Sequence, residues 1–87
     1  PICAGDARGQ TTYAIDEIAA ALTAFGATLD DVVRTRIYLA DADDWEGVSR
    51  AHGRALAAAL PANTLIEVSR LVGPYAVEIE AEAVLRR

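Results

Sequence analysis

Near its C-terminal end the chain carries three glutamates, Glu78, Glu80 and Glu82, which alternate with small apolar residues. Alternate side chains of a β-strand point to opposite faces, so this spacing predicts a row of carboxylates on one face. On an open face, water would surround them and each would be an ordinary solvated group. Where a second subunit covers part of the face, desolvation raises the pKa of a carboxylate and suits it to general-base chemistry. Both interpretations stay open at this point.

The chain has one histidine, His52, on the apolar side of an alanine-rich helical pattern. A packed or hydrogen-bonded imidazole is the more common outcome at such a position, and a catalytic imidazole is the alternative. Cys3 is the only cysteine, which excludes an internal disulfide and is typical of a reducing, cytoplasmic location. Because cysteine and histidine do not occur at metal-ligand spacing, we expect no metal and no other cofactor.

The composition restricts the expected partners. The net charge of -5 leaves no basic stripe for phosphates, so we expect no nucleic-acid partner. No apolar run approaches the length that spans a bilayer, and we expect no membrane partner. A chain of 87 residues buries little apolar area alone, especially when much of it is alanine. Assembly with copies of itself would therefore stabilise the domain.

The hydrophobic pattern predicts one domain over residues 1–87, with the order helix, strand, helix, strand, strand. Asp6 is a suitable N-cap for the first helix and Gly26 a suitable residue to end it. The strand–helix–strand unit should have parallel strands, with both helices on one face of the sheet. This arrangement is a two-layer α+β sandwich with a mixed sheet. The expected elements are Ala7 to Phe25, Val32 to Leu39, a helix from the acidic run Asp41–Asp44 to about Leu60, Pro61 to Leu71, and Val77 to Leu85.

The same pattern predicts which side chains enter the core. The apolar stripe of the first helix should be buried through to Phe25, and Trp45 of the second helix should also be buried. In the first strand, Val33 should face the core together with the alternate residues that follow it. Arg36 and Tyr38 fall on the other face, where they are candidates for a contact between subunits.

Several segments together resemble the RidA/YjgF family, also labelled endoribonuclease L-PSP. They are Leu29 to Leu39, Asp43 to Trp45, Pro61-Ala62, Ile66 to Leu71 and Val77 to Ala81. The resemblance implies a chorismate-mutase-like sandwich that assembles as a homotrimer with ligand clefts between subunits. Family members carry a pair or trio of strands before the first helix. We therefore expect the chain to correspond to the C-terminal two-thirds of a member, with those strands absent.

The resemblance also implies a chemistry. In the founding branch of the family, imines and enamines are hydrolysed to 2-keto acids, an arginine after Pro-Ala binds the substrate carboxylate, and a glutamate on the last strand positions water. The glutamate matches Glu78, whereas the arginine matches Asn63, which offers neutral hydrogen bonds and no charge. Leu65 stands where members often have cysteine, and Ser49 and His52 replace an asparagine and a tyrosine. These departures indicate a divergent branch.

Two functional hypotheses follow. The first is a hydrolase for an imine, enamine or related carbonyl metabolite, with Glu78 as the catalytic residue and a substrate-binding set of Asn63, Leu65, Ser49 and His52. The second is a non-catalytic trimeric module that binds a small metabolite or has a regulatory role. A ribonuclease is not expected, because no histidine pair is present and the acidic balance repels RNA. A tautomerase based on Pro1 is disfavoured, because the segment to Asp6 leaves no room for a long first strand.

Overall fold

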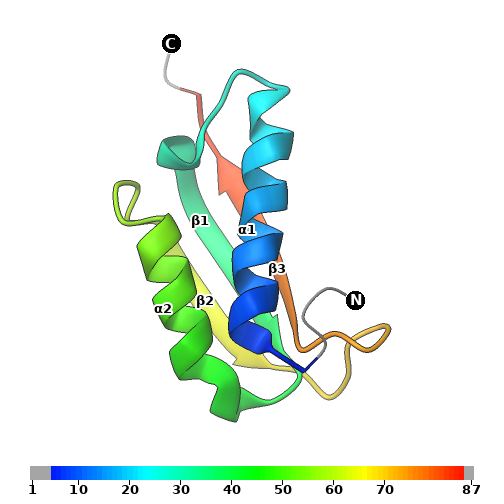
Figure 1. The fold of residues 1–87 in the computed structure, drawn as a ribbon. Coiled ribbons are helices and arrows are strands. Elements are labelled where there is room, and N and C mark those ends of the chain that lie inside the picture. Colours follow the sequence, from blue (N-terminus) through cyan, green and yellow to red (C-terminus); the bar gives the residue numbers. More distant parts are fainter. Residues whose placement is uncertain (1–4, 86–87) are drawn as a thin grey trace.

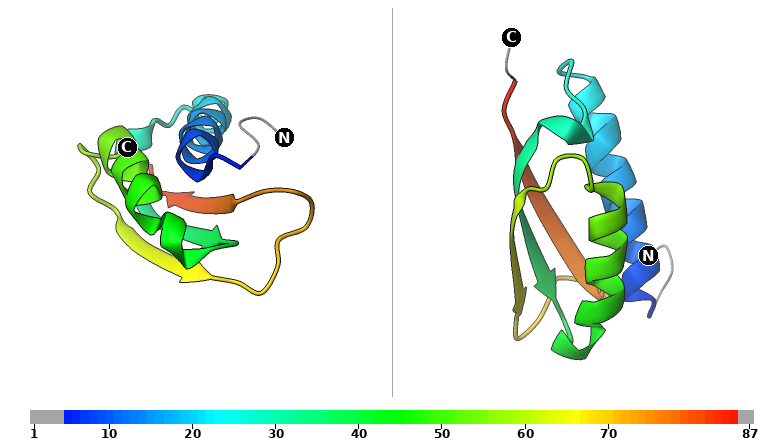
Figure 2. Two further views of the ribbon diagram at one scale, coloured as in Figure 1. Left: turned by 60° about the horizontal axis from the view of Figure 1, so that its bottom comes forward. Right: turned by 90° about the vertical axis from the view of Figure 1, so that its left-hand side faces the viewer.

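The computed structural model describes residues 5–85 (Figure 1). Pro1, Cys3 and the pair Arg86-Arg87 lie outside this range. Two helices form one layer and a three-stranded sheet forms the other (Figure 2). The predicted two-layer α+β sandwich is thus confirmed. The elements are α1 Ala7–Thr23, a short 3-10 turn Leu29–Asp31, β1 Val32–Leu39, a second turn Ala42–Asp44, α2 Trp45–Ala55, β2 Ala62–Glu67 and β3 Val77–Ala83.

The sheet has the order β2-β1-β3, so the first strand lies in the middle. β1 runs parallel to β2, as the strand–helix–strand pattern predicts, and pairs Thr35 with Asn63. β1 runs antiparallel to β3 and pairs Tyr38 with Glu78. Both helices cover the same face, and α1 packs against α2 and β3. The other face of the sheet is left open by all the described residues.

The N-terminal signal of α1 is confirmed, since Asp6 Oδ1 accepts a hydrogen bond of 3.0 Å from the Gly9 amide. The helix ends two residues before the predicted Phe25. Gly26 has a positive φ of 75°, which a glycine adopts without strain, and the Ala27 amide bonds back to the Leu22 carbonyl. Phe25 lies beyond the last helical turn and is 76% exposed, so its predicted burial is wrong.

The second helix is also shorter than predicted. It ends at Ala55, and the chain then turns so that Leu60 adopts a positive φ of 47°. Pro61 disfavours the right-handed helical conformation at the residue before it, so a helix could not continue to Leu60. The predicted burial of Trp45 is wrong: the indole lies at the very start of the helix, at the end of the buried stripe, and is 53% exposed.

β1 contains a β-bulge that the alternation rule did not predict. The pairing with β3 shifts between Val32 and Arg34, so that both Val32 and Thr35 face the helices. An inserted residue reverses the inward and outward alternation on one side of it. Val33 is therefore only partly buried, against the prediction, while the predicted Ile37 is fully buried.

The core consists of two clusters beneath the helices. One surrounds Ile37 and Leu39 of β1 with Val48 of α2, and the other joins Ile15 of α1 with Leu56 after α2. β3 follows the predicted alternation as far as Ala83, with its glutamates exposed on the opposite side. Within residues 5–85, no helix has the length and apolar character that crossing a membrane requires.

Candidate functional site

A chain of hydrogen bonds crosses the helix-covered face of the sheet. Thr35 lies in the middle of β1, His52 lies on the inner side of α2, and Asn63 is the second residue of β2. Thr35 Oγ1 is 2.7 Å from His52 Nε2 and donates a hydrogen bond of 3.0 Å to Asn63 Oδ1. Thr35 and His52 are buried, whereas Asn63 is exposed. We call these three residues the His–Thr–Asn chain.

Burial gives the imidazole of this chain a definite charge state. Desolvation disfavours the imidazolium ion and lowers the pKa of His52 below its ordinary value of 6.5. At neutral pH the ring is therefore uncharged, with one nitrogen a donor and the other an acceptor. The hydrogen-bonded interpretation of His52 is the one that this geometry matches.

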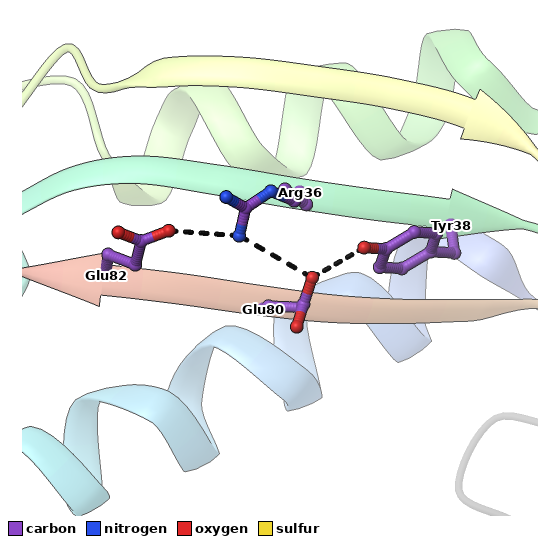
Figure 3. Close-up of polar contacts among 4 residues, drawn as sticks. All are labelled: Arg36, Tyr38, Glu80 and Glu82. Atoms are coloured by element: carbon purple, nitrogen blue, oxygen red, sulfur yellow. Dashed lines mark hydrogen bonds and ion pairs between the residues drawn. The ribbon is translucent and has the colours of Figure 1, made fainter.

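The open face carries a second polar group, made of Arg36, Tyr38, Glu80 and Glu82 (Figure 3). Arg36 Nη1 lies 3.0 Å from Glu82 Oε1 and 3.7 Å from Glu80 Oε1. The Tyr38 hydroxyl donates a hydrogen bond of 2.5 Å to the same oxygen of Glu80, and this bond raises the pKa of Tyr38 above its ordinary value. Glu80 and Glu82 are thus both ion-paired with Arg36, and we call this set the open-face network.

Glu78 is the second residue of β3 and lies on the same open face, paired with Tyr38 of β1. It is exposed, and it lines a groove of about 560 Å³ between α1 and the start of β3. Gln10 of α1 braces one wall, because its Oε1 accepts a hydrogen bond of 2.9 Å from the Ala76 amide. Tyr13 and Tyr75 contribute aromatic rings to the lining. The groove thus offers two carboxylates, Glu78 and Glu17, beside a largely apolar surface.

Sequence reasoning missed the groove residues on α1. Gln10, Tyr13 and Glu17 recur at helical spacing on one side of the apolar stripe of that helix. This periodicity was available as a signal, because residues three and four apart share a helix face. The spacing alone does not identify the strand that this helix face meets, since β3 lies far along the chain at Val77–Ala83.

The substrate-binding residues predicted from the resemblance divide into two groups. Asn63 and His52 are brought together through Thr35, and Leu65 packs against the core on the same face as Asn63. Ser49 is partly buried on α2, one turn before His52. Glu78 lies apart from them. It faces the opposite side of the sheet on the far strand. Two strand spacings separate it from Asn63 by about 10 Å across the strands, and the pairs Thr35–Asn63 and Tyr38–Glu78 add an offset of about 10 Å along them.

Among residues 5–85, no group of three or more His, Cys, Asp or Glu side chains is arranged to hold a metal ion.

A scan against family models matches residues 1–85 to the model described as endoribonuclease L-PSP. A RutC family protein of Pyrococcus horikoshii is 35% identical over 94% of this chain, and the chain spans 65% of that relative's length. A 2-iminobutanoate/2-iminopropanoate deaminase of Escherichia coli K12 is 31% identical over 93% of this chain and 66% of its own length.

Solved structures agree with the sequence comparisons. A member of the YjgF/YER057c/UK114 family from Mycobacterium tuberculosis superposes with a TM-score of 0.89 at 43% identity, covering 93% of this chain and 70% of its own. A yeast protein superposes with a TM-score of 0.88 at 27% identity, covering 94% of this chain and 66% of its own. The fold around the candidate site is therefore one that these proteins share.

Proposed function

The chain belongs to the endoribonuclease L-PSP family, the RidA/YjgF family that its motifs resemble, and from this premise we propose that it hydrolyses a small imine, enamine or related carbonyl metabolite. The observation that carries the proposal is the position of Glu78, an exposed strand carboxylate that lines a groove of about 560 Å³ with aromatic and apolar walls. Such a groove admits a metabolite of a few carbon atoms and presents two carboxylates to it, Glu78 of β3 and Glu17 of α1.

The reaction requires a base and groups that hold the substrate. Water adds to the imine carbon while Glu78 takes a proton from that water. The proton then passes to the former imine nitrogen, which gives the neutral carbinolamine. Glu78 next takes the hydroxyl proton of this intermediate and delivers it to the nitrogen, the carbon–nitrogen bond breaks, and ammonia leaves as the carbonyl forms. The relative named as a 2-iminobutanoate/2-iminopropanoate deaminase supports this class of substrate. Asn63 would orient the substrate through its carboxamide.

The position of the two residues supports a site between copies of the chain. Asn63 shares a face with buried Thr35, whereas Glu78 shares the opposite face with Tyr38. One small molecule cannot contact both residues of a single chain, because the sheet itself lies between them. A cleft that uses both must combine Asn63 of one copy with Glu78 of another, and the predicted homotrimer would supply such a cleft.

The direct test measures ammonia release from freshly generated 2-iminopropanoate, with protein that includes any residues preceding Pro1 in its natural sequence. We expect turnover above background and a loss of about 10²- to 10⁴-fold in Glu78→Gln, the usual range for removing a general base. Glu82→Gln is the matched control, because Glu82 lies on the same strand face but pairs with Arg36. No turnover in the parent protein, or equal turnover in Glu78→Gln, would contradict the proposal.

Mixed assemblies test the placement of the site between subunits. Asn63→Ala and Glu78→Gln chains are purified separately and together, and light scattering establishes the number of chains in each preparation. If one site takes its two residues from different chains, some sites in a mixed assembly contain both native residues. Partial recovery of activity is then expected on mixing. No recovery in verified mixed assemblies would contradict a site that combines Asn63 of one chain with Glu78 of another.

The second candidate function is a non-catalytic module that binds a metabolite. The absence of a cationic side chain at position 63 favours it, because Asn63 provides no charge for a substrate carboxylate. Saturable binding of a carbonyl compound without turnover, unaffected by Glu78→Gln, would support the module over the enzyme.

A further inference from the structure

We propose that the groove between α1 and the start of β3 binds the nitrogen end of its ligand as a cation, either an ammonium group or a protonated imine, and that Glu17 selects for this charge. The assignment rests on the proposed function for the imine substrate and deepens it by naming the charge of the bound group. The preference for a cation is a property of binding, so it is measured whether or not the chain hydrolyses an imine.

The charge of the groove comes from its two walls. Glu17 of α1 and Glu78 of β3 both line it, and no cationic side chain does. Both carboxylates are exposed, and the ion pairs formed within residues 5–85 involve neither of them. Two carboxylates without a partner repel an anion, whereas a cation between the walls is attracted by both.

Two tyrosine rings complete a surface that suits an organic cation. Tyr13 lies one helical turn before Glu17, and Tyr75 comes from the loop before β3; the two are 48% and 47% exposed. Aromatic rings attract ammonium groups, and the apolar part of the lining suits the carbon atoms attached to the nitrogen. A calcium ion takes roughly 6–8 oxygen ligands, more than two carboxylates supply. The lining therefore matches an organic cation better than a bare metal ion.

The walls are held in place by contacts outside the cation site. Gln10 is buried, and its Oε1 accepts the 2.9 Å hydrogen bond from the Ala76 amide, which joins α1 to the start of β3. The ring of Tyr75 packs over Gly73, where a Cβ would lie only 3.1 Å from it. Gly73 also has a φ of 87°, which a glycine adopts without strain. The fold thus sets the spacing of the lining groups before a ligand binds.

A 2-imino acid carries opposite charges at its two ends when its nitrogen is protonated. The nitrogen end matches the groove, whereas Glu17 and Glu78 repel the carboxylate end. The carboxylate therefore lies outside the groove, toward a neutral donor. In the site proposed above, that donor is Asn63 of another copy. The groove in this way determines which end of the substrate enters, and it leaves Glu78 beside the imine.

The first test compares isopropylammonium with 2-propanol, two probes of one shape that differ in charge. The protein includes any residues preceding Pro1 in its natural sequence, and NMR shifts of the Tyr13 and Tyr75 rings report binding in the groove. We expect the ammonium to bind about tenfold more tightly, the combined gain from two exposed ion pairs and one cation–π contact. Glu17→Gln should reduce this preference about two- to fivefold.

Asp16→Asn is the matched control. It removes the same charge from the neighbouring residue of α1, but Asp16 lies in the furrow between α1 and α2 and does not line the groove. The preference should survive in this variant, and an equal loss would mean that the net charge of the protein causes it, which would overturn the proposal. Equal binding of the two probes by the parent protein would also overturn it. So would failure of the ammonium to bind, because the groove would then be covered in the natural protein.

The second test separates the cation preference from the proposed function. Alanine and lactate are compared as inhibitors of 2-iminopropanoate turnover, since both carry a carboxylate and only alanine carries a cationic nitrogen. We expect alanine to inhibit at about tenfold lower concentration. Glu17→Gln should raise KM about two- to fivefold with little change in kcat, whereas Glu78→Gln should lower kcat.

The two proposals fail in different ways. Turnover with equal inhibition by alanine and lactate would overturn the cation preference and leave the hydrolase standing. Tighter binding of isopropylammonium than of 2-propanol, lost in Glu17→Gln but without any turnover, would support the cationic groove while removing the hydrolase.

Discussion

The face of the sheet beneath the helices holds its polar groups in a fixed chain, whereas the open face holds them in contact with water. Thr35 and His52 are buried, and Thr35 Oγ1 is hydrogen-bonded to both His52 and Asn63. Arg36 and Glu82 form an ion pair whose side chains remain 36% and 55% exposed. The same strand, β1, supplies the central residue of both groups.

The polar groups of the covered face therefore contribute to the stability of the fold, whereas those of the open face can change partners. A buried donor or acceptor that loses its partner costs free energy, so the covered face keeps one arrangement. Exposed ion pairs exchange readily with water and contribute little. The covered face is therefore suited to hold Asn63 in one orientation, and the open face is suited to rearrange when a second molecule covers it. The first three predictions test the covered face and the last tests the open one.

The largest expected effect is on the packing beneath the helices. Ile37 is 0% exposed in the first core cluster, so Ile37→Ala should lower the free energy of unfolding by about 2–5 kcal/mol. Ile66 lies on the neighbouring strand and is 44% exposed, so Ile66→Ala is the matched control, with an expected cost of about 0.5 kcal/mol or less. Urea unfolding of both variants checks the difference, and equal costs would contradict the contrast between the faces.

A smaller effect on the free energy of unfolding is expected when the buried hydroxyl of Thr35 is removed. Thr35→Val keeps the shape of the side chain but leaves His52 Nε2–H and Asn63 Oδ1 without their partner. We expect a cost of about 1–3 kcal/mol, the usual penalty for an unsatisfied buried polar group. Thr35→Ser is the control for the hydroxyl, and it should retain the tautomer of His52 in nitrogen–proton spectra. A stabilised Thr35→Val would mean that the chain of bonds is not formed.

How far the sequence predicts this molecule differs between the two faces. The layer order, the parallel pairing of β1 with β2 and the outward glutamates of β3 follow from periodicity, because burial of one face imposes alternation along each strand. The β-bulge at Val33 and the exposed Trp45 do not follow from it. A bulge depends on how β3 meets β1, and exposure of a helix end depends on which element lies above it.

The sequence identified most residues of the candidate site but not how they are arranged in space. The motif positions pointed to Asn63, His52 and Glu78. Neither composition nor spacing pointed to Thr35, an ordinary strand residue whose importance comes from its position between α2 and β2. The alternation of apolar and polar residues also did not show that Glu78 and Asn63 lie on opposite faces of the sheet. Their placement on opposite faces requires the register of both strand pairs, which is a property of the folded chain.

A pH-dependent effect comes next in size. Because burial holds the pKa of His52 below 6.5, the unfolded chain takes up a proton before the folded chain as the pH falls. The free energy of unfolding therefore rises with pH between the lowered pKa of folded His52 and the ordinary value of 6.5. The contribution of His52 to stability is lost as the pH falls below 6.5. Urea unfolding of the parent protein and of His52→Gln at about pH 7.5 and about pH 5.5 isolates the contribution of the imidazole from that of the carboxylates. A parent protein that gains stability at the lower pH, relative to His52→Gln, would contradict the assignment.

The smallest effect is expected on the open face. Breaking the pair with Arg36→Met, Glu82→Gln and the double variant should give a coupling free energy of about 0.2–1 kcal/mol, because the 3.0 Å contact is exposed to water. The coupling should vanish in about 1 M salt, where charges are screened within a few ångströms. If a second copy covers this face, the coupling should instead grow with protein concentration, because association stabilises only the folded form. A coupling well above 1 kcal/mol that depended on neither salt nor protein concentration would mean that the open face is as fixed as the covered one, and the separation of roles argued from β1 would fail.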